Sequence, residues 1–249
     1  MALREPSIVA RASGVVAVEK PAGLPTQAPP GIPSLESWLR FRAGAASAYL
    51  GVPHRLDRAV SGIMLFAESP RAARQLSRQF ERREIVKRYL AIVTTGTGDP
   101  RSGDVWEDHL AKVADEARVE TVPEAAPKAR RAVTRVVGVV GLGTERLLLV
   151  LEPLTGRMHQ LRVQAAARGY AVVGDTLYGG PAAPTVAAGG DPRTQPILLH
   201  AWEIGWRDPD TGARRWARAA LPAHWQSEAG LDGRLNEFVR DHGSGSQPP

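Results

Sequence analysis

Residues 52–67 read VPHRLDRAVSGIMLFA, and this stretch decides how the rest of the chain is interpreted. The run at residues 63–67 is short, wholly apolar and preceded by turn residues, which is typical of a buried strand. Asp57 comes just before that run, so we expect it in a loop at the mouth of a core strand. Arg55 and Arg58 flank it, and nearby cations favour an ionised carboxylate. A loop held by a structural ion pair explains the same residues, so motifs elsewhere have to decide.

Composition limits the possible classes of protein. The 249 residues, 43% of them hydrophobic, suit one large domain or two closely joined ones with a sizeable core. A net charge of +6 fits an anionic partner without selecting between nucleic acid, membrane and acidic substrate. The absence of cysteine excludes disulfides, thiolate metal sites and cysteine nucleophiles. No apolar run approaches the roughly 18 residues of a membrane span, and the N-terminus lacks a signal-peptide core, so we expect a cytoplasmic protein.

The remaining pattern predicts many strands and few helices. Strands are expected at residues 14–18, 84–94 and 198–206, a hairpin at 131–140 and 146–152, helices at 34–42, 69–83 and from about 156 to 168, and a strand-like piece at 170–180. Residues 95–130 predict loops with a short edge strand or two. Residues 1–13 are interpreted as a leader, 181–196 as a mobile loop and 241–249 as a disordered tail. Strands outnumber helices, which favours an α+β fold with a largely antiparallel sheet.

The helix at residues 69–83 has clear start signals, with Ser69 at the N-cap and Pro70 at the first helical position. At about 100° per residue, four of its arginines share one face. These arginines are Arg71, Arg74, Arg78 and Arg82. A face that meets phosphates and an ordinary solvated helix face both explain the pattern.

Two further residues are expected on rigid elements. Strand alternation places Tyr89 on the same face as Lys87. Thr155 is expected to cap the helix that begins near residue 156 and contains Arg162. An arginine half-buried in such a helix needs an acidic partner, because an unpaired buried charge is costly, and Asp57 is a candidate.

Several motifs together resemble the RluA-like pseudouridine synthases. In order, they are VVAVEKPAGLP, HRLDRAVSGIMLFA, KRYLAIV, TGRMHQLRVQAAARG, GDTLYGG and LLHAWEI, spanning roughly residues 14–206. The resemblance implies that family's fold, a central, mostly antiparallel sheet divided by a catalytic cleft and flanked by helices and loops. It also implies one catalytic domain at residues 14–240, without a separate N-terminal RNA-binding domain. Val60 and Gln164 depart from the pattern, standing where threonine and histidine are common.

The resemblance assigns roles residue by residue. Asp57 is similar to the catalytic aspartate, Tyr89 to the tyrosine that stacks on the uracil, and Arg162 to the basic residue paired with the aspartate. Arg55 looks like the arginine that fills the place of the departing base. Further residues expected to contact RNA are His54, Arg58, Lys87, Arg157, His159, Arg71, Arg74 and Arg78.

The implied reaction isomerises uridine in RNA. The bond between C1′ and N1 breaks, the uracil turns, and C5 is joined to C1′. Nothing is oxidised and no group leaves, so no cofactor or metal is expected, and the sequence has no P-loop, GxGxxG or HExxH motif. A carboxylate suits chemistry at a sugar C1′, either by attack on the ribose or by taking a proton at C2′. Structured rRNA or tRNA is the expected partner, and a monomer without membrane contact is the expected state.

Two other functions are compatible with the residues. A glycosidase or nucleosidase also cleaves at C1′, but most need a second carboxylate, for which Glu68 and Asp175 are candidates. Such an enzyme would release a free base or sugar. A non-catalytic RNA-binding protein would tolerate the loss of Asp57.

Overall fold

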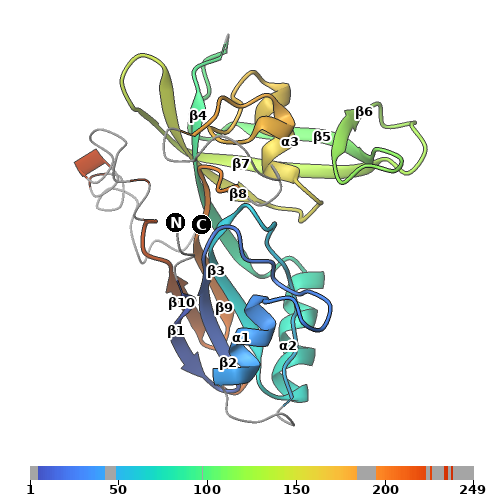
Figure 1. The fold of residues 1–249 in the computed structure, drawn as a ribbon, viewed down its shortest axis with the longest axis vertical. Helices are drawn as coiled ribbons and strands as arrows, with labels where there is room; N and C mark the ends of the chain where they lie inside the picture. Colours follow the sequence, from blue (N-terminus) through green and yellow to red (C-terminus); the bar gives the residue numbers. More distant parts are fainter. Residues whose placement is uncertain are drawn as a thin grey trace.

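The computed structural model describes residues 5–42, 49–96, 98–183 and 195–222, together with residues 225, 233, 234 and 237. Within these residues, ten strands form one mixed sheet, accompanied by three α-helices and a 3₁₀ turn (Figure 1). The predicted tail at 241–249 and most of the predicted loop at 181–196 lie outside the described residues. No described helix is long and apolar enough to cross a membrane.

The strands follow one another across the sheet in the order β1-β2-β3-β9-β4-β8-β7-β5-β6, and β10 pairs with β9. Their bounds are β1 Ser7–Ala12, β2 Val15–Lys20, β3 Ser61–Ala67, β4 Val86–Thr94, β5 Val105–Lys112, β6 Val119–Val122, β7 Arg130–Gly141, β8 Arg146–Pro153, β9 Leu199–Arg207 and β10 Arg214–Arg218. The helices are α1 Leu35–Arg42, α2 Pro70–Glu81 and α3 Gln160–Ala167, with the 3₁₀ turn at Thr176–Tyr178.

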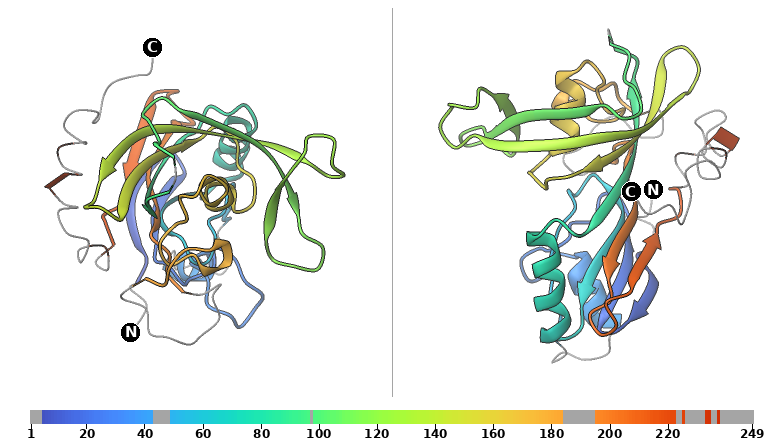
Figure 2. Two further views of the ribbon diagram at one scale, coloured as in Figure 1. Left: turned by 90° about the horizontal axis from the view of Figure 1, so that it is seen from above. Right: turned by 180° about the vertical axis from the view of Figure 1, so that it is seen from behind.

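The sheet has two parts that share its central strands. Figures 1 and 2 show β1, β2, β3, β10, α1 and α2 in the lower part and β5 to β8 with α3 in the upper part, with β4 running from one to the other. Among the described strands, only β3 and β9 pair in parallel. The prediction of an α+β fold with a largely antiparallel sheet is therefore confirmed.

Strand β3 explains why residues 61–67 are continuously apolar: every residue of the strand is buried. Met64 and Phe66 belong to the same core cluster as the α1 leucines, whereas Ile63 and Leu65 belong to the cluster that includes Ala72 and Leu76 of α2. A strand covered on both faces needs apolar residues at every position rather than at alternate ones.

Gly62 fixes how β3 starts beside β9. It has a φ of 124°, a conformation that favours glycine, and a Cβ there would lie 2.2 Å from the carbonyl oxygen of Ala201. The parallel contact, in which Ser61 pairs with His200 and Gly62 with Ala201, depends on this close approach. The loop that carries Asp57 leads directly into this crossing, so the crossing also sets where that loop ends.

Three predicted elements differ in detail. Ser7–Ala12 forms β1 and pairs with β2, where the sequence predicted only a leader. Residues 170–180 form the 3₁₀ turn and an isolated bridge between Val172 and Val93 instead of a strand. The glycines that bound this segment favour turns over extended pairing.

The helix predicted from residue 156 begins only at Gln160. His159 precedes it with a φ of 51°, a left-handed conformation that cannot continue an α-helix. Thr155 is therefore not the N-cap. Its hydroxyl instead accepts a hydrogen bond from the Val133 backbone and contacts the Gln160 side chain, tying the helix start to β7. Gly169, which follows the helix, adopts a left-handed φ of 80° that ends it.

Candidate active site

A cavity of about 800 Å³ lies over the centre of the sheet. One wall comes from the loop before β3 and the end of α2, and the opposite wall from the end of β8 and the start of α3. Asp57, Tyr89 and Arg162, which the sequence predicted to act together, all line this cavity although they come from three distant parts of the chain.

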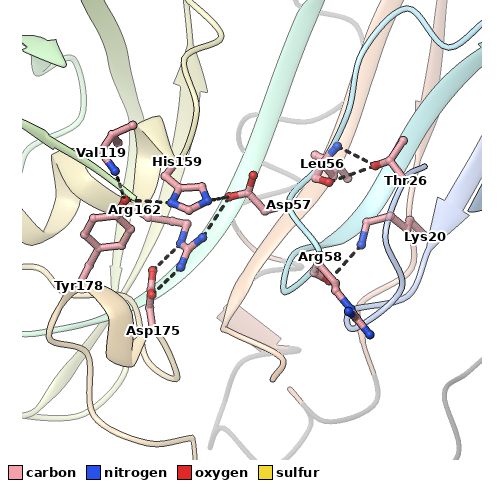
Figure 3. Close-up of polar contacts among 10 residues, drawn as sticks. All are labelled: Lys20, Thr26, Leu56, Asp57, Arg58, Val119, His159, Arg162, Asp175 and Tyr178. Atoms are coloured by element: carbon pink, nitrogen blue, oxygen red, sulfur yellow. Dashed lines mark hydrogen bonds and ion pairs between the residues drawn. The ribbon is translucent and has the colours of Figure 1, made fainter. Parts of the chain in front are cut away.

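The Asp57 carboxylate is held from one side by α3 and the residue before it. Its Oδ2 accepts a hydrogen bond from Arg162 Nη1 at 3.2 Å and lies 3.6 Å from His159 Nε2 (Figure 3). The expected pair of Asp57 and Arg162 is therefore present. The Asp57 side chain retains 28% exposure, so the carboxylate is anchored and still reachable from the cavity.

Arg162 has a second acidic partner, which the sequence did not predict. Its Nε and Nη2 donate to Asp175 Oδ2 and Oδ1 at 2.6 and 2.8 Å, a two-pronged pairing of buried groups. Burial opposes the charged guanidinium, but the hydrogen bonds and charges of Asp175 and Asp57 prevail and raise the pKa of Arg162. The sequence sign of this buried partner is a single acidic residue within the largely apolar segment YAVVGDTLY. The sequence predicted Asp175 only as a candidate second carboxylate for a glycosidase.

His159 and Tyr178 support the aspartate from behind. His159 Nδ1 lies 2.9 Å from Tyr178 Oη, which accepts a hydrogen bond from the Val119 backbone of β6 at 3.0 Å (Figure 3). If the tyrosine donates its own proton to Nδ1, the Nε2 proton points toward Asp57. Burial lowers the pKa of His159 despite the nearby Asp57 carboxylate, which favours the neutral imidazole. His159, predicted as an RNA contact, thus lies beside the carboxylate.

Two buried polar side chains fix the loop that carries Asp57. Thr26 Oγ1 both accepts from the Leu56 backbone N–H and donates to its carbonyl. Lys20, fully buried, donates to the carbonyls of Leu24 at 2.8 Å, Pro21 at 3.1 Å and Arg58 at 3.3 Å. Burial lowers the pKa of Lys20 to about 7, with the Asp57 charge opposing that shift. The sequence segment VEKPAGLPT therefore stabilises the loop that carries Asp57.

Two predicted RNA contacts, His54 and Arg58, make hydrogen bonds within the protein. His54 Nε2 accepts a hydrogen bond from the Leu65 backbone at 2.8 Å, and its ring stacks on Phe80. Burial, and then the charge of Lys87, lower the pKa of His54 to about 3, so it offers no positive charge to a phosphate. Arg58 does not line the cavity, and its Nε donates to the Gly23 carbonyl at 2.8 Å.

The other predicted contacts divide by position. Arg55, Lys87 and Arg157 line the cavity, and Arg55 is exposed at its edge. The arginines of α2 do not line the cavity. Arg71, Arg74 and Arg78 are exposed, and Arg71 pairs with Asp210 at 3.2 Å.

Tyr89 occupies the middle of the cavity floor. It pairs with Leu151 of β8 on one side and Ala201 of β9 on the other, and its ring packs partly on the main core cluster. Burial, together with the Asp57 charge, raises the pKa of Tyr89, so the phenol stays neutral. The ring is therefore a fixed, uncharged aromatic surface beside the carboxylate.

The two acids considered for a glycosidase are absent from this cavity. Both oxygens of Asp175 accept hydrogen bonds from Arg162, and Glu68 pairs with Arg11 at 3.0 Å on the far side of β3. Glu81 and Glu152 do line the cavity. Glu152 lies within 3.8 Å of Arg88 and 3.3 Å of Arg135, so it is held as an ion-pair partner.

Comparison with known proteins agrees with this geometry. A family model described as RNA pseudouridylate synthase matches residues 14–167. Dual-specificity RNA pseudouridine synthase RluA of Haemophilus ducreyi is 33% identical over 196 residues, covering 78% of this chain and 83% of that protein. The tRNA pseudouridine synthase C of Salmonella typhimurium is 34% identical over 178 residues, covering 69% of this chain and 68% of that protein.

A solved structure supports the fold. Human RNA pseudouridylate synthase domain containing 1 superposes with a TM-score of 0.69 at 24% identity, covering 99% of both chains. The protein is thus an isomerase that acts on RNA. It belongs to the RluA-like family of RNA pseudouridine synthases.

Proposed function

We propose that this enzyme converts particular uridines of rRNA or tRNA to pseudouridine, with Asp57 acting at the ribose of a uridine turned out of its helix. The observation that carries the proposal is the Asp57 carboxylate, held by Arg162 at 3.2 Å in a cavity that Tyr89 also lines. One relative is named for tRNA and another for dual specificity, which supports these two substrate classes. We further propose that the protein works as a monomer in the cytoplasm, outside any membrane.

The charges around Asp57 suit a reaction at C1′. Arg162 lies between two carboxylates, so Asp175 offsets part of its positive charge and Asp57 is not fully neutralised. Among the described residues, no side chain binds Asp57 Oδ1, because Arg162 and His159 both approach Oδ2. That oxygen is available to the ribose, whether it bonds to C1′ or takes the proton at C2′.

The remaining cavity residues account for the turned-out base. Removing a base from its stack costs on the order of a few kcal/mol. Stacking of the uracil on Tyr89 returns about 1–3 kcal/mol. Arg55, exposed at the cavity edge, takes the vacated place in the RNA.

Mapping pseudouridines tests the function directly. Carbodiimide-dependent reverse-transcription stops would be compared in cells with the gene, without it, and with it restored. We expect one or more stops in rRNA or tRNA to vanish on deletion and return on complementation. Release of free uracil or ribose from RNA by the purified enzyme would instead identify a nucleosidase.

The Tyr89 ring, rather than its hydroxyl, is expected to bind the base. Tyr89→Phe should keep RNA affinity within about twofold, whereas Tyr89→Ala should lose about 1–3 kcal/mol of binding free energy. Equilibrium filter binding, with a transcript in which the wild-type enzyme forms pseudouridine, measures the RNA affinity of both variants. An equal loss in the two variants would assign the contact to the hydroxyl.

The arginine face of α2 is proposed as an approach surface for the RNA backbone, since Arg74 and Arg78 are exposed beside a cavity wall. Charge reversal at both should weaken RNA binding and reduce the slope of log affinity against log salt by about 0.7 for each lost phosphate contact. Reversal of exposed Arg101, which pairs with Asp99 away from this helix, is the control. An unchanged slope would mean that the arginines of α2 form an ordinary solvated face and do not contact RNA phosphates.

A further inference from the structure

The cavity extends beyond the space next to Asp57. Besides Tyr89, its lining also includes Lys87 of β4, Phe80 of α2, Arg83 just after α2 and Glu152 of β8. Of these residues, only Tyr89 is assigned to the uracil in the proposed reaction. This second part of the cavity is therefore available to another portion of the RNA.

Lys87 is the feature of this region that points to a ligand. Its side chain is half-buried, yet it makes no hydrogen bond or ion pair within 4.0 Å with any residue of the described ranges. The charge of Glu152 raises the pKa of Lys87, but the Glu152 carboxylate is already paired with Arg88 and Arg135. A half-buried ammonium without a hydrogen-bond or ion-pair partner is unfavourable, so a bound anion would stabilise its charge further than Glu152 does.

The surroundings of Lys87 leave space for an anion next to its ammonium group. Gly156 faces it, and even an added Cβ there would stay 3.8 Å from Nζ. His54 is neutral at its side. The charged residues that line the cavity around it are Glu152 on β8, Glu81 and Arg83 at the end of α2, and Arg157 before α3.

Lys87 and Tyr89 are close enough along β4 to contact neighbouring parts of one RNA chain. Lys87 and Tyr89 point to the same face, and alternate residues of a strand lie roughly 6.6 Å apart. The bulge between Arg88 and Tyr89 in the pairing with β9 leaves the alternation of β4 unbroken, because Arg88 does not line the cavity while both neighbours do. With a uracil on Tyr89, Lys87 lies two residues away on the same face, where the RNA backbone next to that base can reach it.

We propose that Lys87 binds the phosphodiester adjacent to the turned-out uridine, forming a second subsite that fixes the RNA register. This inference rests on the proposed function, since it uses the same cavity. Lys87 is a binding and positioning residue, and the chemistry at the ribose does not require it.

This subsite gives RNA binding a dependence on pH. Burial lowers the pKa of Lys87 to about 8, with Glu152 opposing that shift. A phosphodiester favours the protonated amine, so affinity should fall as pH rises through that value. If the bound lysine stays protonated, the loss from pH 7 to pH 9 is about tenfold.

The test compares wild type with Lys87→Met, Lys87→Arg and the control Lys112→Met, whose lysine is exposed on β5 outside the cavity. The probe is an in vitro transcript in which wild type forms pseudouridine, chosen from tRNA and rRNA fragments labelled with tritium at uridine C5. Affinity is measured at pH 7 and 9 and at several salt concentrations. The single-turnover rate is measured separately at saturating enzyme.

We expect Lys87→Met to bind about tenfold more weakly at pH 7, with the salt slope reduced by about 0.7 and an unchanged saturated rate. Lys87→Arg should bind nearly as wild type at pH 7 and lose the pH dependence, because arginine stays protonated. Lys112→Met should match wild type.

Two outcomes overturn the subsite. Unchanged affinity and salt slope in Lys87→Met would show that no phosphate binds there. A fall in the saturated rate at unchanged affinity would assign Lys87 to the reacting uracil. Either result leaves the proposed function standing, because wild type still forms pseudouridine. Failure of wild type on every transcript would refute the function itself.

Discussion

Asp57→Asn is expected to lower the single-turnover rate of pseudouridine formation by about 10⁴-fold or more while RNA binding stays within a few-fold of wild type. The amide keeps the shape of the carboxylate and can still accept from Arg162, so the loop should remain in place. It lacks the negative charge and the nucleophilic oxygen that the reaction at the ribose needs. Release of tritium from C5 of labelled uridine measures the rate, and filter binding measures the affinity.

Two controls make this result specific. Asp210→Asn removes an acid that pairs with Arg71 on the surface, far from the cavity lining, and should leave the rate unchanged. Asp57→Ala should be as inactive as Asp57→Asn, because both lack the carboxylate. Substantial residual activity in either Asp57 variant would remove this residue from the chemistry and require another carboxylate, such as Glu152.

Asp175→Ala should lower the free energy of unfolding by about 3–5 kcal/mol, more than the Asp175→Asn and Asp99→Ala substitutions described below. Arg162 is only 6% exposed, and this change removes two of its three hydrogen bonds to carboxylates. A buried guanidinium then retains only Asp57. Urea unfolding followed by tryptophan fluorescence measures the effect.

The matched comparison is a surface pair. Asp99→Ala breaks an ion pair with Arg101 in which both side chains are more than three-quarters exposed, so it should cost about 0–1 kcal/mol. Asp175→Asn should fall between the two, because it keeps an oxygen acceptor without the charge. A loss below about 1 kcal/mol in Asp175→Ala would mean that Arg162 finds solvent or another partner when Asp175 is absent.

The sequence predicted the parts of the fold that local physics determines. The apolar run at residues 63–67, the Ser69 cap of α2 and the hairpin of β7 and β8 follow from burial, capping and alternation, and all three are present. The motifs in order predicted the family. The resemblance to that family then implied that Asp57, Tyr89 and Arg162 lie together, and all three line one cavity although each comes from a different part of the chain.

Contacts set by tertiary structure were not predictable in the same way. Nothing local marks Asp175 as the main partner of Arg162, because the pairing depends on how the turn at residues 174–180 folds back on α3. The left-handed conformation of His159 likewise goes against the helical preference of its surroundings. His54 looks like a basic RNA contact in HRLDR, and only its burial shows that it is neutral.

The way the cavity floor is built decides which partner has to deform. Strand β4 is hydrogen-bonded to β8 along residues 89–94 and to β9 along residues 86–91. The strands on both sides of the cavity therefore belong to one continuous sheet rather than to two bodies joined by a hinge. Moving the two sides of the cavity toward each other would break main-chain hydrogen bonds of this sheet. The nucleic acid is the softer partner, and uridines in loops, bulges or mismatches, which are cheapest to extract, should be isomerised faster than the same uridine in an intact duplex.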